Sequence, residues 1–208
     1  MKDLTKIISN NSPNLGFKPG KVNHSLKKLL ILGYSKNIFR KKVLECDAYI
    51  FGSSIKTEMG FCSGVQITKS DNLSTLEKTD FIVIDNPSDV NFNIYRYKNP
   101  IGIKIKEKLS LLRINAIEAI NFDFIIYDRA LSPNFNDILD IKELLSNIDT
   151  HCFINIHKSN INLDYLELIF DIDISGIIVD LDTLNKKEFS NLTKNINNLK
   201  EAKEKKDE

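Results

Sequence analysis

Tryptophan is absent from the 208 residues, and cysteine, glycine and net charge are all scarce. The 29 Lys and Arg residues nearly balance the 28 Asp and Glu residues, which leaves a formal net charge of +1. A chain this close to neutrality has no general positive field to attract nucleic acid or anionic lipid. We therefore expect neither nucleic acid nor a membrane among its partners.

Long apolar runs are missing as well. No stretch approaches the roughly 18 consecutive apolar residues of a transmembrane helix, and the opening MKDLTKI shows no apolar run of signal-peptide length. Cys46, Cys62 and Cys152 are odd in number and form no CxxC pair. That pattern fits reduced thiols better than a disulfide framework or a structural zinc site. Together these absences predict a cytoplasmic protein.

The eight glycines leave little material for loops that wrap a phosphate with backbone amides. The segment GFKPGK (16–21) is one residue short of a P-loop, and Val22 stands where Ser or Thr would hold Mg²⁺. Gly33 and Gly52 are single glycines and make no GxGxxG dinucleotide fingerprint. His151 and His157 would lie roughly 20 Å apart on an extended strand, too far to share an ion. We expect no cofactor and no metal.

What the sequence does contain is a series of short, β-branched apolar runs, most of them followed by a segment with helical spacing. This alternation predicts βαβ units and a mostly parallel sheet. The predicted strands are LLILG (29–33), AYIFG (48–52), FIVID (81–85), IGIKIK (101–106), FIIYD (124–128), CFINIHK (152–158) and GIIVD (176–180). The predicted helices cover residues 35–45, 72–78, 107–121, 136–147 and 162–172.

The spacing of these runs favours an α/β fold of the TIM type, a (β/α) barrel. Seven strand–helix units are visible, and the widest gap, between Gly52 and Asp85, could hide an eighth strand at GVQIT (64–68). Otherwise the barrel is small or incomplete. The alternative is an open, doubly wound parallel sheet, because 208 residues is short for a barrel of about 250.

Three regions are expected along the chain. Residues 1–24 show no periodicity and read as an N-terminal arm, residues 25–193 form a single barrel-like domain, and residues 194–208 form a charged C-terminal tail.

The segments FDFIIYDRALSP, HCFINIHK and DISGIIVDLD resemble the later strands of TIM-barrel proteins, in which an Asp recurs at the strand end. They are also loosely similar to an uncharacterised family of bacterial barrel-like proteins with the same strand order. The resemblance implies a fold and carries over no active-site residue. Many TIM barrels bind phosphate with the loops after the last two strands. Here the loop LDTLNKKE has no glycine, which departs from that pattern.

Candidate site residues follow from alternation along two predicted strands. In IGIKIK the isoleucines share one face and leave Lys104 on the other, and in CFINIHK the same argument separates Asn155 and His157 from the isoleucines. If the isoleucines pack against helices, these three polar side chains point into the barrel. Asp85, Asp128 and Asp180 close their strands near the same rim.

Two functions are compatible with this arrangement. In the first, the protein is a lyase or isomerase acting on a small carbonyl metabolite, with Lys104, His157 and Asp128 as catalytic residues and Asp85, Asn155 and Asp180 as ligand-binding residues. Lysine could form a Schiff base, and histidine could shuttle the proton. In the second, Lys104 forms an interior ion pair or reaches water at a sheet edge, and the barrel is a non-catalytic binding or assembly subunit with a protein partner or a second copy of itself.

Overall fold

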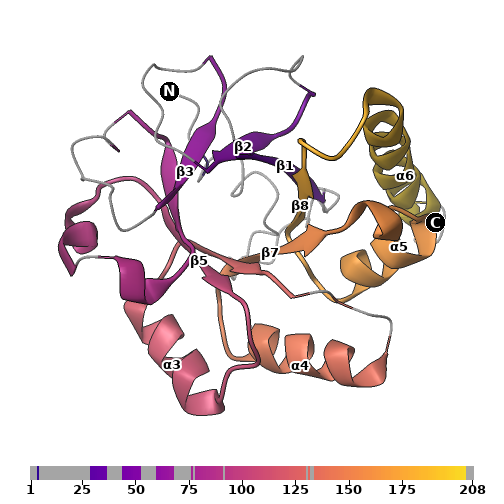
Figure 1. The fold of residues 1–208 in the computed structure, drawn as a ribbon. Helices are drawn as coiled ribbons and strands as arrows, with labels where there is room; N and C mark the ends of the chain where they lie inside the picture. The colour runs from indigo at the N-terminus through magenta and orange to yellow at the C-terminus, as the bar shows by residue number, and fades with distance from the viewer. Residues whose placement is uncertain are drawn as a thin grey trace, which may run out of the picture.

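The computed structural model describes residue 4 and residues 29–36, 44–52, 60–67, 76, 78–90, 92–129, 131 and 134–204. Eight parallel strands form a closed barrel in which each strand pairs with the next and the last pairs with the first (Figure 1). The strands are β1 (Leu30–Ser35), β2 (Ala48–Phe51), β3 (Ser63–Ile67), β4 (Phe81–Ile84), β5 (Ile101–Ile105), β6 (Phe124–Tyr127), β7 (His151–Ile156) and β8 (Gly176–Asp180). The TIM-type fold is therefore confirmed, and the open sheet is wrong.

The eighth strand lies where the widest gap between predicted strands left room for it. Strand β3 covers Ser63–Ile67 and pairs with both β2 and β4, so the barrel is complete. Its sequence SGVQI contains a glycine and a glutamine, which dilute the apolar character that marks the other strands. The ring closes through β3, because this strand pairs with β2 on one side and with β4 on the other.

Helices cover the outside of the barrel on the side of its later strands (Figure 1). They are α3 (Leu111–Ile120), α4 (Phe135–Ser146), α5 (Leu163–Asp171) and α6 (Lys186–Glu204), with 3₁₀ helices η1 (Pro87–Asp89), η2 (Phe92–Arg96) and η3 (Lys158–Asn160). The helices predicted at 107–121, 136–147 and 162–172 correspond to α3, α4 and α5. Most of the predicted segments 35–45 and 72–78 lies outside the described residues. No helix in the described part of the chain is long and apolar enough to cross a membrane.

Alternation along the strands separates two apolar clusters. The outward side chains, such as Ile103, Ile125 and Ile154, pack in one cluster with helical residues such as Leu144 and Leu166. The inward side chains form a second cluster inside the barrel, which includes Leu30, Phe81, Phe124 and Phe153. The core of the molecule is thus two concentric layers, one inside the barrel and one between strands and helices.

Leu4 belongs to the interior cluster and is fully buried. It comes from the segment 1–24 that the sequence predicts to be an arm, and the rest of that segment lies outside the described residues. At the other end of the chain, α6 continues to Glu204, into the predicted tail. The domain boundaries at 24 and 193 stay predictions.

Candidate functional site

The side chain of Lys104 lies inside the barrel, where polar groups from neighbouring strands surround its ammonium group. Nζ donates to Gln66 Oε1 at 2.9 Å and lies 3.2 Å from Asp85 Oδ1 and 3.8 Å from Asp128 Oδ2. The side chain is only 10% exposed. A closed barrel has no edge strand, so the expectation that Lys104 reaches water at a sheet edge is wrong. The interior ion pair expected of a non-catalytic barrel is present, with both Asp85 and Asp128.

A tyrosine covers the same ammonium group from β1. Lys104 Nζ lies 5.4 Å from the centre of the Tyr34 ring, within the range of a cation–π contact. Burial raises the pKa of the Tyr34 hydroxyl, and the negative charges of Asp180, Asp85, Asp182 and Asp128 raise it further. The Tyr34 hydroxyl therefore remains protonated at neutral pH.

Each of the two aspartates beside Lys104 has a second partner. Asn155 Nδ2 donates to Asp128 Oδ1, and Lys106 Nζ donates to Asp85 Oδ2 at 2.6 Å. Burial alone would raise the pKa of Asp85, but the hydrogen bonds and charges of Lys106 and Lys104 outweigh it and lower the pKa below its ordinary value. We call Lys104, Tyr34, Gln66, Asp85, Asp128 and Asn155 the Lys104 cluster.

The structure does not bring the other two predicted site residues into contact with Lys104. His157 follows β7, is exposed and precedes η3, and its ring makes no hydrogen bond or ion pair with any described residue. Asp180 ends β8 and shapes the following turn, because its Oδ1 accepts from the amide of Asp182 at 2.9 Å. Both residues lie at the carboxyl ends of their strands, which in a parallel barrel form one rim, here called the mouth.

Three residues of the mouth and interior were not predicted from the sequence. Gln66 and Tyr34 contact Lys104 directly, and the carboxylate of Asp182 accepts from Ser35 Oγ and from the amide of Lys36, each at 2.9 Å. The alternation of Gly64 and Gln66 against Val65 and Ile67 was a usable signal for Gln66, once β3 is recognised as a strand.

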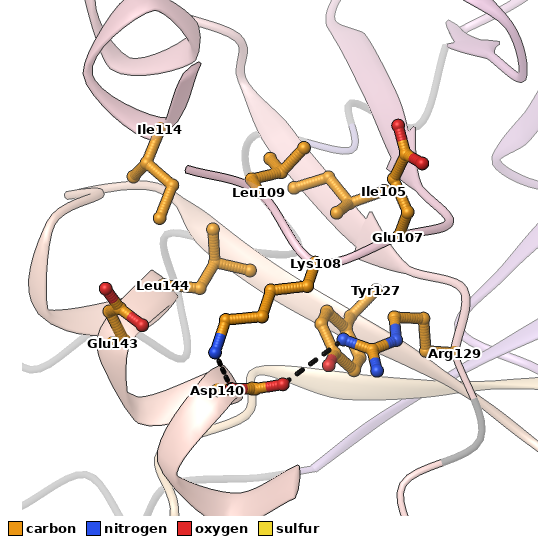
Figure 2. A pocket seen from close by; sticks show the side chains of 10 residues that line it. All are labelled: Ile105, Glu107, Lys108, Leu109, Ile114, Tyr127, Arg129, Asp140, Glu143 and Leu144. Carbon is orange, nitrogen blue, oxygen red and sulfur yellow. Dashed lines mark hydrogen bonds and ion pairs between the residues drawn. The ribbon is translucent and has the colours of Figure 1, made fainter. Parts of the chain in front are cut away.

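A shallow pocket lies outside the barrel, between the segments that follow β5 and β6 and the helix α4 (Figure 2). Asp140 of α4 accepts from Lys108 Nζ at 2.5 Å and lies 3.5 Å from Arg129 Nη1. The hydrogen bond from Lys108 lowers the pKa of Asp140 below its ordinary value. Asp140 thereby joins α4 to both segments, and the two cations of this pocket are already paired.

In the described part of the chain, no group of three His, Cys, Asp or Glu side chains is arranged to hold a metal ion. The thiols of Cys46 and Cys152 have pKa values raised to about 12 by burial, so they are protonated and unreactive at neutral pH. The Lys104 cluster brings together a buried cation, two carboxylates, two amides and a phenol near the carboxyl ends of the strands.

The chain matches no family model and no curated protein sequence. It does match solved structures. A tryptophan synthase from M. tuberculosis aligns over 83% of this chain and 91% of that chain, with a TM-score of 0.55 and 9% identity. The structure of 3-keto-L-gulonate-6-phosphate decarboxylase from Vibrio cholerae aligns over 83% and 99%, with a TM-score of 0.53 and 13% identity.

A third match is the DHPS of Yersinia pestis, which aligns over 84% of this chain and 94% of that chain with a TM-score of 0.52 and 8% identity. The chain has the fold of a TIM barrel. At such low identities the likenesses show the fold alone, and a barrel fold hosts many unrelated activities.

Proposed function

We propose that the protein is a lyase or isomerase that acts on a small carbonyl metabolite at the mouth of the barrel. The observation that supports the proposal is the position of Lys104, a desolvated cation held between Asp85 and Asp128 in the barrel interior. In TIM-barrel enzymes, catalytic groups come from the carboxyl ends of the strands, where this cluster lies. Two of the similar structures bear the names of a synthase and a decarboxylase.

The proposed chemistry is enolisation, a step that isomerases and aldol-type lyases share. The Asp128 carboxylate, oriented by Asn155, removes a proton from the carbon next to the carbonyl. The electron pair of that C–H bond forms the carbon–carbon double bond of an enediolate. Lys104 Nζ donates a hydrogen bond to the carbonyl oxygen and stabilises its developing negative charge. For a 2-hydroxy carbonyl compound, Asp128 returns the proton to the former carbonyl carbon. His157 takes the proton of the adjacent hydroxyl and supplies one to the former carbonyl oxygen, which gives the isomer, and these protons exchange with solvent.

This role uses Lys104 as an ammonium ion. As an ammonium ion it donates to Gln66 Oε1 and lies beside the carboxylates of Asp85 and Asp128. A Schiff base would instead require the ammonium to lose its proton before attack on the carbonyl. The two routes differ in one observable. Borohydride reduction traps a covalent adduct on Lys104 only in the Schiff-base route.

The test is deuterium exchange at the carbon next to the carbonyl, followed by NMR in D₂O with a panel of small aldehydes and ketones. We expect exchange with the wild type, a loss of about 10²–10⁴-fold in Lys104→Met and in Asp128→Asn, and wild-type rates in the control Lys142→Met, a substitution of an exposed lysine on α4. Exchange that survives Lys104→Met unchanged would contradict the proposal.

A non-catalytic binding or assembly subunit is the second candidate, and a separate observation favours it. Large apolar side chains are exposed at the first turns of neighbouring helices: Leu112 of α3 is 83% exposed, and Phe135 of α4 is 72% exposed. Large apolar side chains left exposed to this degree are available for a protein contact, and they mark one where they form a continuous patch. Absence of deuterium exchange with every aldehyde and ketone of the panel, together with a dimeric mass by light scattering, would favour this candidate.

A further inference from the structure

The loop that joins β8 to α6 has no backbone amide left for a ligand. In many parallel barrels this loop contributes free N–H groups to a phosphate site. Here the five amides from 181 to 185 all donate to the chain itself. Their acceptors are Tyr34 O for Leu181, Asp180 Oδ1 for Asp182, Asp180 O for Thr183 and Leu184, and Glu188 Oε2 for Asn185.

The carboxylate of Asp182 already occupies the position of an anion between β8 and β1. Its Oδ1 accepts from Ser35 Oγ and its Oδ2 accepts from the Lys36 amide, both at 2.9 Å. A hydroxyl and a backbone amide that converge on two oxygens are the donors that a bound phosphate would use. The carboxylate of Asp182 therefore already accepts the hydrogen bonds that a phosphate would accept at this position.

The charges around the Lys104 cluster also disfavour the binding of a phosphate group. Four carboxylates, those of Asp85, Asp128, Asp180 and Asp182, act on the Tyr34 hydroxyl. The cations that pair with Asp85 and Asp128 are Lys104 and Lys106. A dianionic group placed among these four carboxylates would meet net repulsion.

We infer that the ligand of the barrel mouth is a neutral, hydroxylated carbonyl compound without a phosphate group. The carbonyl part of this inference rests on the proposed function, and the exclusion of phosphate rests on the hydrogen bonds of Asp182 and the β8–α6 loop. Gln66, Asn155 and the Tyr34 hydroxyl supply polar groups of the kind that bind sugar hydroxyls. Lys104 supplies the donor for the carbonyl oxygen.

The first arm of the test uses inorganic phosphate and does not depend on catalysis. Melting temperature is measured against phosphate concentration at constant ionic strength, in the wild type, in Asp182→Ala and in Asp149→Ala. Asp149 is exposed and precedes β7, at the other end of the barrel. The general stabilising effect of phosphate acts on all three proteins alike. We expect an additional, saturable rise only in Asp182→Ala, where Ser35 Oγ and the Lys36 amide lose the carboxylate of Asp182 as their acceptor and the ion can take its place.

The second arm compares deuterium exchange of glyceraldehyde with that of glyceraldehyde 3-phosphate. We expect the wild type to favour the neutral aldehyde, on the order of tenfold, and Asp182→Asn to reduce that preference. Asp182→Gly replaces Asp182→Ala in the first arm if the alanine variant does not fold, since it too removes both acceptor oxygens.

Two results would overturn the inference: a saturable phosphate effect in the wild type as large as that in the Asp182 variant, or faster exchange of the phosphorylated aldehyde. Absence of exchange with both aldehydes would count against the proposed function instead. In that case the phosphate titration still decides whether Asp182 fills the anion position.

Discussion

Among single residues, Asp85 makes the contribution of the Lys104 cluster to the free energy of unfolding depend on pH. Its pKa in the folded protein lies below the ordinary 3.8, because hydrogen bonds from Lys106 and Lys104 outweigh the effect of burial. A carboxyl with a lowered folded pKa stabilises the fold above its unfolded pKa and loses this contribution as the pH falls through the folded value. We therefore expect Asp85→Asn to lower the free energy of unfolding at pH 7 and to approach the wild type toward pH 3.

Urea denaturation at pH 7, 5 and 3 measures this difference, with Asp149→Asn as a matched control at an exposed position. The control should show no comparable gap at pH 7. A gap for Asp85→Asn that stays constant down to pH 3 would mean that the Asp85 carboxylate gains nothing from its two lysines.

Alternation along single strands was sufficient to predict that Lys104 and Asn155 point into the barrel. It could not supply their partners, because those come from remote parts of the chain. Gln66 lies 38 residues from Lys104, and Ser35 lies 147 residues from Asp182. Such pairs depend on which strands become neighbours and in which register. The exposure of His157 likewise depends on the course of the chain after β7, which periodicity does not describe.

At the scale of helices and strands, asparagine has a definite role. Asn134 and Asn162 begin α4 and α5, and each accepts a backbone amide at 2.9 Å from the third residue of its helix. We expect Asn162→Ala to lower the free energy of unfolding by about 1 kcal/mol. The same substitution at Asn197, exposed within α6, should be neutral or slightly stabilising, because alanine is the better helix former. Thermal unfolding of both variants measures the contrast, and equal effects would contradict the capping role.

Apolar runs predicted seven of the eight strands, and helical spacing predicted α3, α4 and α5 within a few residues. The predicted start of α3 at 107 is early because Ser110 accepts the amide of Arg113 and begins the helix at Leu111. Between β4 and β5 the described residues contain two 3₁₀ helices and no α-helix. There Ile94, Val90 and Tyr97 cover the barrel in place of a helix.

At the scale of the whole molecule, three glycines of the strands make room for large rings inside the barrel. Gly64 pairs in register with Phe81, Gly102 with Phe124, and Gly176 with Phe153. A side chain at Gly64 or Gly102 would meet the phenylalanine ring of the next strand, since an added Cβ would lie 2.2 or 2.1 Å from it. Phe124 also contacts Phe81 and Phe153 edge to face, with ring centres 5.7 and 5.8 Å apart. Large rings fill the interior because the neighbouring strand has no side chain at that level.

This complementarity predicts a specific coupling. Gly102→Ala should lower the free energy of unfolding by about 1–3 kcal/mol, since the methyl group collides with a ring that the interior cluster holds in place. Phe124→Leu makes room for the methyl group, so the double variant should be more stable than the sum of the single effects predicts, by about 0.5–3 kcal/mol. Urea denaturation of the four proteins of this cycle measures the coupling.

Gly60→Ala is the control for the cycle, because nothing lies within 4 Å of an added Cβ there. It should leave stability unchanged to within about 1 kcal/mol. Additive effects of Gly102→Ala and Phe124→Leu would show that the ring moves aside without cost. The barrel interior would then tolerate side chains at its glycines, and the pairing of each phenylalanine with a glycine would not limit how the strands close.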